Sequence, residues 1–436
     1  MRIIPNTPTA PEPSAASSCE TAPSPAPVPP APAPAWRARA ILDNPVTANV
    51  LHAAWSGDPL VLVPAPPGSG KSRLVALLAA TLADRVGLRV GVAAQTREQA
   101  AELARRIGAL TDHTVLGWSK GQALPDLGGV PVTVTEGRSL RYPGTRGGVV
   151  IATTALWLNR EPGALGADVL VVDEAWQATY ADLGALGAFA SQVVAVGDPG
   201  QIDPVVTGET GRWAASRTAP HLPGPDALLS AHGDAASVVA LRYTYRLGPV
   251  TTALIQPVFY PALPFTSRRP PEHVTDKAGQ VLHEVVAAPV TVTGGPGDPI
   301  LAHACADRVR VLVGARLTTG EGTRLVTAAN VIVTCAHVSQ AGAVRALLAD
   351  LPDVLVGTTN AVQGSERAVA VVLHPLAGYR EVTPFGTDPG RTCVMLSRHR
   401  AHMTLVTDTA TPEVLARSQD PHAPMHGALL AGLPTT

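Results

Sequence analysis

The chain has 436 residues, of which 46% are hydrophobic, so it can hold two or three domains and is not a wholly disordered protein. Its formal net charge of −1 excludes a protein that is basic throughout, and any nucleic-acid site must therefore be local. No run of about 18 uninterrupted apolar residues predicts a transmembrane helix. The first residues lack the apolar segment of a secretory signal, so we expect a cytoplasmic protein that does not bind membranes.

The four cysteines lie far apart in the sequence and form no C-x-x-C pair. This spacing is typical of a reduced cytosolic protein, without a disulfide framework or a structural zinc site. Each cysteine is therefore interpreted as a small buried or incidental residue.

The chain opens with a biased segment over residues 1–40. Up to about residue 36 it consists mainly of Pro, Ala, Ser and Thr. Such a segment cannot bury enough apolar surface to offset the entropy lost on ordering. We expect a disordered tail, which could bind a protein partner that recognises polyproline II segments.

A glycine-rich loop joins a predicted strand at residues 60–63 to a predicted helix at residues 74–80. Its sequence over residues 65–72, APPGSGKS, fits the pattern G-x-x-x-x-G-K-[ST] except that Ala65 replaces the first glycine. Alanine is one methyl group larger and is tolerated where the backbone has an ordinary φ. Strand, loop and helix in this order predict a P-loop.

The residue types of this loop explain how it would hold a nucleotide. Gly68 and Gly70 allow backbone N–H groups to close on phosphate oxygens, and the helix N-terminus adds partial positive charge. Lys71 can reach the β- and γ-phosphates, and the Ser72 hydroxyl can hold Mg²⁺. We therefore expect ATP to contact Pro67, Gly68, Ser69, Gly70, Lys71, Ser72 and Arg73.

Apolar runs predict the other strands of the first half, at residues 88–94, 148–152, 168–172 and 192–196. These runs are continuously hydrophobic rather than alternating, as in strands covered on both faces. Thr96 is expected to cap a helix over residues 97–107. Residues 111–147 are expected to be irregular, except for a strand at 132–134. The pattern predicts a doubly wound parallel sheet, in a domain spanning residues 41–232.

Acidic and amide side chains follow two of these strands. Asp173 and Glu174 come directly after the strand at 168–172. In a P-loop ATPase the first acid holds Mg²⁺ and the second activates the attacking water, although a strand-end Asp can also simply cap a helix. Asp198 and Gln201 follow the next strand, at the edge where doubly wound sheets bind ligands.

The second half repeats the α/β pattern without a P-loop, in a predicted second domain over residues 233–436. Its strands are predicted at residues 237–241, 331–334, 354–356, 368–373 and 403–406. Its helices are predicted at residues 249–259, 300–314 and 338–350. Two tandem α/β domains are therefore expected after the tail.

In order along the chain, the motifs resemble those of superfamily 1 helicases over about residues 44–408. In particular they resemble the 5′-to-3′ branch that includes the RNA-decay helicases, whose signature D-E-A-x-Q matches residues 173–177. Motifs I, Ia and III are similar to residues 65–72, 93–100 and 197–201, and motifs IV, V and VI to residues 243–249, 358–366 and 394–400. The resemblance implies two RecA-like domains, the cofactors ATP and Mg²⁺, and a single strand of nucleic acid lying across both domains.

The resemblance also implies roles for single residues. Gln201 would sense the γ-phosphate, and Arg246 and Arg398 would act as arginine fingers, because a planar guanidinium can neutralise the transferring oxygens. Asn49 stands where the family usually has a glutamine that reads adenine, and Glu366 would also contact the nucleotide. The phosphates of the nucleic acid would be contacted by Thr96, Thr153 and Thr359.

Two other functions fit parts of the sequence. One is an ATPase switch that acts on a protein partner without unwinding, which the near-neutral charge favours. The other is a P-loop kinase, which gives Arg246, Gln363 and Arg398 no role. DNA and RNA are not distinguished, because a motor of this kind grips the backbone. Trp118 and Tyr260 are the candidate base-stacking residues, although a lone aromatic more often belongs to a core.

Overall fold

The computed structural model describes residues 36–136, 139–144 and 147–435. Most of the tail expected over residues 1–40 lies outside the described residues. Its last residues belong to the fold, because Ala38 is buried and Arg39–Leu42 form a 3₁₀ turn. The chain from Arg37 to Thr436 groups into one unit by its internal contacts. Within the described ranges, no helix is long and apolar enough to cross a membrane.

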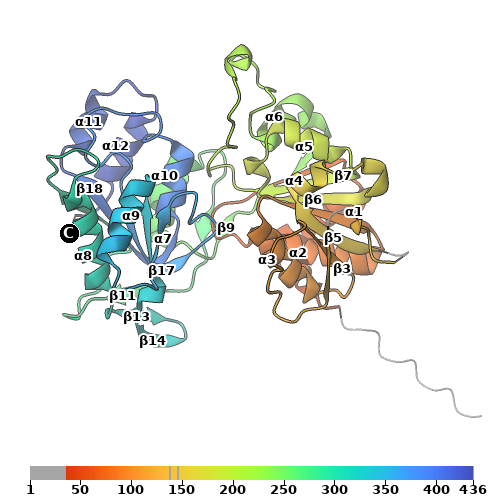
Figure 1. The fold of residues 1–436 in the computed structure, drawn as a ribbon, viewed down its shortest axis with the longest axis horizontal. Coiled ribbons are helices and arrows are strands. Elements are labelled where there is room, and N and C mark those ends of the chain that lie inside the picture. Colours follow the sequence, from red (N-terminus) through yellow and green to blue (C-terminus); the bar gives the residue numbers. More distant parts are fainter. Residues whose placement is uncertain (1–35, 137–138, 145–146, 436) are drawn as a thin grey trace, which may run out of the picture. The chain divides into compact units, whose positions relative to one another are not determined.

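The first sheet has eight strands, and each neighbouring pair is parallel (Figure 1). Its order is β4-β3-β5-β2-β6-β7-β1-β8. The strands are β1 Leu60–Pro64, β2 Arg89–Ala94, β3 Thr114–Trp118, β4 Val132–Glu136, β5 Gly148–Thr153, β6 Ala167–Asp173, β7 Ala190–Gly197 and β8 Ala236–Val238.

Helices cover this sheet because both of its faces are apolar. One face packs Leu60, Leu62 and neighbouring strand residues against Trp157 and Leu183, while the alternate residues such as Val61 are also buried. The helices are α1 Pro45–Ser56, α2 Lys71–Thr81, α3 Arg97–Gly108, α4 Thr154–Leu158, α5 Tyr180–Gly187 and α6 Gly224–His232. Short helical turns occupy Leu82–Val86, Pro162–Ala164, Ala175–Gln177, Gly211–Trp213, Gly233–Ala235 and Ala328–Asn330.

The second sheet has five parallel strands in the order β12-β18-β17-β15-β16. They are β12 Val285–Val290, β15 Val331–Cys335, β16 Leu355–Thr358, β17 Arg367–Leu373 and β18 His399–Asp408. The helices that follow and precede them are α7 Pro249–Phe259, α8 Pro299–Leu312, α9 Val338–Leu347, α10 Pro389–Leu396, α11 Thr411–Arg417 and α12 Ala423–Ala431.

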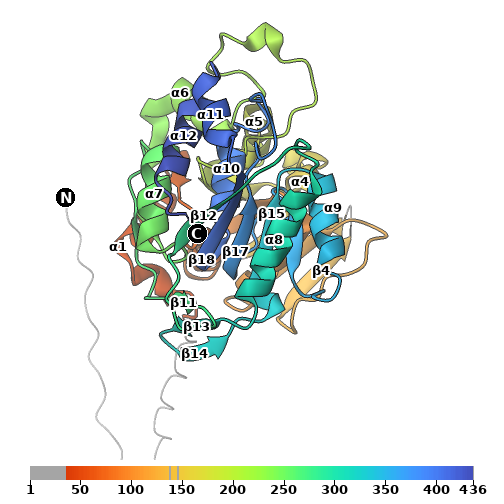
Figure 2. The same ribbon diagram turned by 90° about the vertical axis from the view of Figure 1, so that its left-hand side faces the viewer.

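Alternating residues of this sheet enter two separate cores. Val331 and Val333 pack in the core that includes α8 and α9, whereas Ile332 packs in the core that includes α7, α10 and α12. Figure 2 shows α8 and α9 on one side of the sheet and α7 and α12 on the other. The continuous apolar runs of the sequence are explained by this double coverage.

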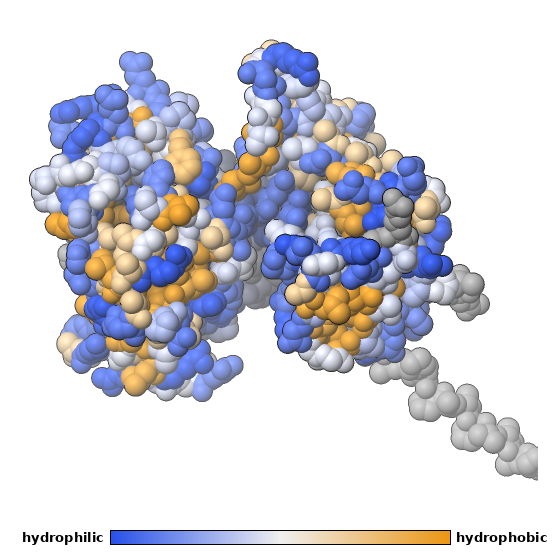
Figure 3. Space-filling model, viewed as in Figure 1, coloured by the Kyte–Doolittle hydropathy of each residue, from blue (hydrophilic) through white to orange (hydrophobic). Residues whose placement is uncertain are grey.

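Two smaller sheets complete the second half. Strand β9 Tyr243–Thr244 pairs with β10 Thr266–Ser267, and β11 His273–Thr275, β13 Arg316–Thr319 and β14 Gly322–Leu325 form an antiparallel sheet. Hydrophilic residues cover much of the face seen in Figure 3, with hydrophobic areas between them. The expected fold class, α/β with two tandem parallel sheets, is confirmed.

Three details differ from the expectations. Residues 114–118 were expected to be irregular but form the buried strand β3. The strand was not predicted because its apolar run is too short to be distinguished from a loop. Strand β12 was not expected either. Strand β8 pairs with β1 in the first sheet, so this sheet continues beyond residue 232, where the first domain was expected to end. An apolar run predicts a strand but not the sheet that it joins.

Candidate functional site

The glycine-rich loop follows the carboxyl end of β1 and leads into α2, as expected. Gly68 and Gly70 have φ values of 71° and 88°, which glycine adopts without strain. Ala65 is buried, its N–H donates to Gly197 O over 2.8 Å, and it is not among the described residues with positive φ. Alanine therefore fits the position at which the pattern has its first glycine.

Strand β9 and the residue after it hold this loop from the second half of the chain. The Thr244 hydroxyl donates to Pro67 O over 2.7 Å, and the Tyr245 N–H donates to Gly68 O over 2.9 Å. A Cβ placed on Gly68 would lie 2.3 Å from the Cβ of Arg246. The P-loop and the first predicted arginine finger are therefore in direct contact.

Lys71 is buried and faces Asp198, with 3.4 Å between its Nζ and Asp198 Oδ2. The same carboxylate accepts from the Gln201 side chain over 2.7 Å and from the Tyr260 hydroxyl over 2.8 Å. Gln201 in turn accepts from the Gln363 amide over 3.3 Å. Asp198 thus joins the P-loop lysine to groups from both halves of the chain.

The two acids after β6 differ in their surroundings. Asp173 is buried, and desolvation together with the nearby Glu174 raises its pKa to about 7, while Lys71 opposes the rise. Glu174 has a φ of 52° and is the one non-glycine residue with positive φ in the described ranges. A residue other than glycine in this left-handed conformation is uncommon, and such residues cluster at functional sites.

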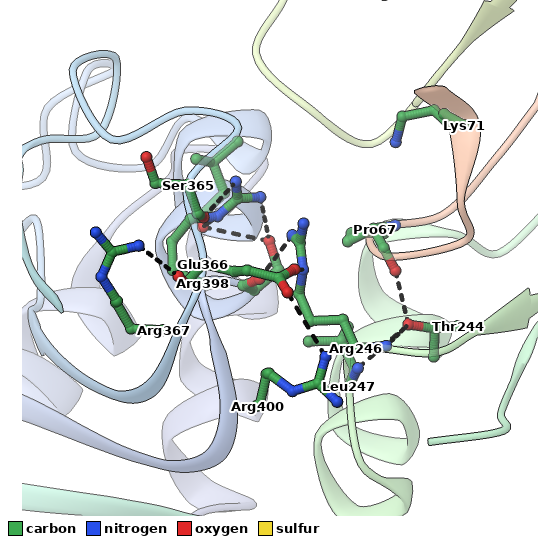
Figure 4. A network of polar contacts seen from close by, with 12 residues as sticks. Pro67, Lys71, Thr244, Arg246, Leu247, Ser365, Glu366, Arg367, Arg398 and Arg400 are labelled. Atoms are coloured by element: carbon green, nitrogen blue, oxygen red, sulfur yellow. Dashed lines mark hydrogen bonds and ion pairs between the residues drawn. The ribbon is translucent and has the colours of Figure 1, made fainter. Parts of the chain in front are cut away.

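Arg246 is held by an acid of the second half (Figure 4). Its Nε donates to Glu366 Oε2, and one of its terminal nitrogens donates to Ser397 O over 3.3 Å. Arg400 also lies 3.6 Å from Glu366. The two arginines lower the pKa of the Glu366 carboxyl, against the effect of desolvation, so that it stays ionised.

Arg398 is almost fully buried, with 1% of its surface exposed. Its guanidinium donates to Val394 O over 2.8 Å and to the Ser397 hydroxyl over 2.9 Å, and it reaches Ser365 O. Desolvation, and to a lesser degree Arg246, lower its pKa to about 10. It remains charged at neutral pH and is satisfied by neutral oxygens rather than by a carboxylate.

A single cavity of about 470 Å³ joins most of these groups. Twelve of the residues expected to contact or act on the nucleotide line it, namely Pro67, Gly68, Ser69, Gly70, Lys71, Ser72, Arg73, Glu174, Gln201, Arg246, Glu366 and Arg398. Asp173 is buried behind this lining. The cavity can hold an anionic ligand, because five arginines and a lysine line it against two carboxylates.

Four lining residues were not expected from the sequence, namely Arg106, Tyr245, Gly364 and Arg400. Arg400 and Tyr245 lie within two residues of the predicted arginine fingers, so proximity could have indicated them. Arg106 gave no such signal, because it lies in the last turn of α3 and pairs with Glu102 like an ordinary helix surface pair.

Asn49 does not line this cavity, and the structure does not support it as the residue that reads the base. It is exposed on α1, and sequence spacing alone did not fix the side of the helix on which it lies. A neighbouring cavity of about 580 Å³ is lined instead by Asn44 and Thr47, together with Tyr245 and the P-loop. Asn44 caps α1 by accepting from the Val46 N–H.

The three threonines expected at phosphates all follow or end strands at a carboxyl edge. Thr96 caps α3 by accepting from the Gln99 N–H, and Thr153 caps α4 by accepting from the Leu156 N–H. Thr359 is fully buried and its hydroxyl has no hydrogen-bond partner. Its side chain therefore does not reach the surface at which a phosphate contact was expected.

The residues of the cavity fit a nucleoside triphosphate with Mg²⁺. The Ser69 hydroxyl is buried without a partner beside two glycines of positive φ, which is the arrangement expected of a phosphate cradle. Ser72 and Asp173 offer oxygen ligands for Mg²⁺. In the described part of the chain, no cluster of three His, Cys, Asp or Glu residues could hold a metal ion by itself, so phosphates and water would supply the other ligands.

A family model described as an AAA domain matches residues 47–222, which include the P-loop, Asp173 and Gln201. No curated protein matches the chain. Among solved structures, the chain is similar to the helicase nonstructural protein 10 of an arterivirus, with 16% identity over 86% of this chain and a TM-score of 0.44. A DNA complex of arterivirus nonstructural protein 10 matches with 14% identity over 86% of this chain and a TM-score of 0.46. The PRRSV helicase matches with 16% identity over 83% of this chain and a TM-score of 0.42.

The chain spans 63%, 64% and 54% of the lengths of these three structures, in the same order. The match over residues 47–222 supports a P-loop NTPase domain in the first half of the chain.

Proposed function

We propose that this protein is an ATP- and Mg²⁺-dependent nucleic-acid motor of the superfamily 1 helicase type. The observation that carries the proposal is the shared cavity, in which Arg246 and Arg398 face the P-loop, Glu174 and Gln201. A phosphate-binding loop alone fits many enzymes. Two arginines brought to it from the second half fit ATP hydrolysis coupled to movement between two domains.

The roles follow from the chemistry of phosphoryl transfer. The P-loop N–H groups and Lys71 would hold the β- and γ-phosphates, and Ser72 and Asp173 would hold Mg²⁺, which neutralises developing charge when bound. Glu174 would orient the attacking water, and Gln201 would contact the γ-phosphate. Arg246 and Arg398 would stabilise the negative charge of the transition state.

The base would lie in the neighbouring cavity that Asn44, Thr47 and Tyr245 line, rather than at Asn49. Tyr245 lines both cavities and is 43% exposed, so its ring can stack on a base while its N–H stays bonded to the P-loop. The proposal therefore keeps ATP as the nucleotide, with Tyr245 in place of Asn49 as the residue that would contact the base.

Single-stranded DNA or RNA would lie along the carboxyl edges of the two sheets, near Thr96 and Thr153. The test is ATPase turnover measured with single-stranded DNA, with single-stranded RNA and with neither. We expect one or both strands to raise the turnover rate, and Lys71→Ala to abolish it. The matched control is Arg417→Gln, which removes an exposed arginine of α11 that lines neither the main cavity nor its neighbour.

The outcomes separate the three functions. ATP hydrolysis that no nucleic acid stimulates would overturn the motor and favour a switch acting on a protein partner. Phosphate transfer to a small acceptor would indicate a kinase. Full activity in Lys71→Ala would contradict the assignment of the P-loop itself. Arg246→Ala and Arg398→Ala should each lower the turnover rate by about 10³-fold or more while leaving nucleotide binding measurable.

A further inference from the structure

The exposed aromatic ring of Phe385 is stacked with other side chains in the second half of the chain. The rings of Phe385 and His337 are stacked, with 4.9 Å between their centroids and 21° between their planes. The guanidinium carbon of Arg391 lies 3.8 Å from the centroid of the Phe385 ring. The Tyr379 hydroxyl is 2.9 Å from Nε2 of His337. We call these four residues the Phe385 stack.

The Phe385 stack lies at the carboxyl edge of the second sheet. His337 follows the end of β15, and Tyr379 and Phe385 lie in the segment that connects the end of β17 to α10. Since β15 and β17 are parallel neighbours, both strands end at the same edge. A Cβ on Gly390, beside Arg391, would lie 2.4 Å from Gln201 O, so the start of α10 packs against the loop that follows β7. The stack is therefore adjacent to the first sheet's carboxyl edge.

The column is rigid although part of it faces solvent. Phe385 is 41% exposed. The backbone N–H of His337 donates to the Gln340 side chain over 3.2 Å at the start of α9, and the Tyr379 hydroxyl lies 2.9 Å from Nε2 of the His337 ring. The loop is closed by hydrogen bonds from Gly386 N and the Thr387 hydroxyl to Thr383. An exposed ring that is fixed in this way loses little conformational entropy when it stacks on a ligand.

The charge at the Phe385 stack is not neutralised by the protein. Arg391 makes no ion pair within the described ranges, and its Nε is buried without a hydrogen-bond partner. The Asp388 carboxylate accepts from the backbone N–H of Arg391 over 2.6 Å and makes no hydrogen bond to its guanidinium within the described ranges. An aromatic ring beside an unpaired guanidinium matches a ligand that carries both a π-face and an anionic group.

We propose that the Phe385 stack is a base-stacking contact for a single strand of nucleic acid. This inference rests on the proposed function and adds to it a residue outside the resembling motifs. The exposed ring stacks on a base, and Arg391 meets the neighbouring phosphate. Because every base has a π-face, the contact is independent of sequence. It supplies the stacking that Trp118 and Tyr260 cannot, since they are 7% and 1% exposed.

The test compares strands with and without bases. The probes are fluorescein-labelled oligothymidylate and oligouridylate, each with an abasic strand of equal length, and binding is measured by anisotropy. The wild-type chain should prefer the base-containing strand. Phe385→Leu should reduce this preference by about 5- to 150-fold, the range expected for one base–aromatic stack, whereas Phe385→Trp should keep it.

Arg391→Gln separates the phosphate contact from the stack. It should weaken binding of the base-containing and abasic strands alike and lower the slope of log affinity against log salt by about 0.7. The control is Trp55→Ala, since Trp55 is 63% exposed at the end of α1, before the amino end of β1, and should change neither quantity. ATPase turnover without nucleic acid should be unchanged in Phe385→Leu, which shows that the fold is intact.

Each outcome bears on one of the two proposals. Normal binding of the base-containing strand by Phe385→Leu, with the wild-type preference over the abasic strand, would overturn the stacking contact and leave the motor standing. Failure of the wild-type chain to bind any of the four probes would overturn the motor, and the stacking contact with it.

Discussion

The contact between the P-loop and Arg246 gives the sharpest prediction, because two glycines of one loop differ in the atoms that a new Cβ would meet. Gly68 and Gly70 both have positive φ, so alanine at either position costs about 1–2 kcal/mol of backbone strain. A Cβ on Gly70 would meet no atom within 4 Å. A Cβ on Gly68 would lie 2.3 Å from Arg246 Cβ and 3.1 Å from Arg246 N, so the two chain segments must move apart.

Overpacking of this kind typically costs a further 1–3 kcal/mol or so. Gly68→Ala should therefore lower the free energy of unfolding by about 2–5 kcal/mol and Gly70→Ala by about 1–2 kcal/mol. For a domain of this size the difference corresponds to roughly 2–12 °C in the thermal midpoint. The assay is thermal unfolding of both variants without nucleotide, so that altered phosphate binding does not contribute.

A double-mutant cycle with Arg246→Gly identifies the cause. Glycine at position 246 removes the Cβ that the new methyl group would meet. In that background the extra cost of Gly68→Ala over Gly70→Ala should shrink, and what remains comes from the contacts of 3.1 Å with Arg246 N and Thr244 Oγ1. Equal midpoints for Gly68→Ala and Gly70→Ala in the wild-type background would refute the reasoning. An undiminished difference beside Arg246→Gly would refute it too, because the strain would then not come from the Arg246 Cβ.

Three other predictions concern charge and acid stability. Burial lowers the pKa of His374 and His399 to about 3 and that of His402 to about 4, below the value of about 6.5 in an unfolded chain. Between these values the unfolded state binds more protons than the folded state. The free energy of unfolding therefore decreases as pH falls below 6.5. At pH 5 the loss should be on the order of 2 kcal/mol per histidine, and urea midpoints that match at pH 7.5 and pH 5 would contradict it. Asp198→Ala should destabilise by about 2–4 kcal/mol, because Tyr260 and Gln201 lose a buried acceptor, whereas Asp203→Ala, in an exposed acid of the same loop, should cost less. Glu366→Gln should lower the free energy of unfolding by less than about 1 kcal/mol, because the Glu366 side chain is 39% exposed, and a larger loss would mean that its pair with Arg246 stabilises the fold of the second half.

The fold was predictable where a local pattern carries the whole signal. Thr96 caps α3 as expected, and the bounds of α7 are those expected from the sequence. The phosphate loop could be recognised because glycine, lysine and serine at fixed spacing have few other uses. Strand β8 shows what a local pattern does not predict. Its residues predict a strand, but they do not indicate that it pairs with β1.

The site residues that lie at strand ends and in motifs could be predicted. Contacts between residues distant in the sequence could not. Arg106 lines the cavity from the last turn of α3, and no spacing in the sequence encodes that placement. The Phe385 stack joins residues 48 and 54 positions apart in sequence, His337 to Phe385 and His337 to Arg391, so no local pattern could have shown it. Asn49 shows the opposite limit: it has the expected spacing but lines neither cavity, because spacing does not fix the side of a helix on which a residue lies.

The cations of the cavity also explain why the two halves of the chain should respond together to a nucleotide. Lys71 is held by Asp198, Arg246 by Glu366, and Arg398 by backbone and hydroxyl oxygens. A triphosphate must therefore exchange with these partners rather than add to bare charges, and its binding free energy is reduced by the interactions that it replaces. When Lys71 turns to the phosphates, Asp198 keeps its bonds to Gln201 and Tyr260, and Tyr260 lies 3.1 Å from Cys393 of α10. Since α10 also carries Arg391, the same exchange would reach the Phe385 stack, through which the proposed motor would couple the nucleotide to the proposed strand contact.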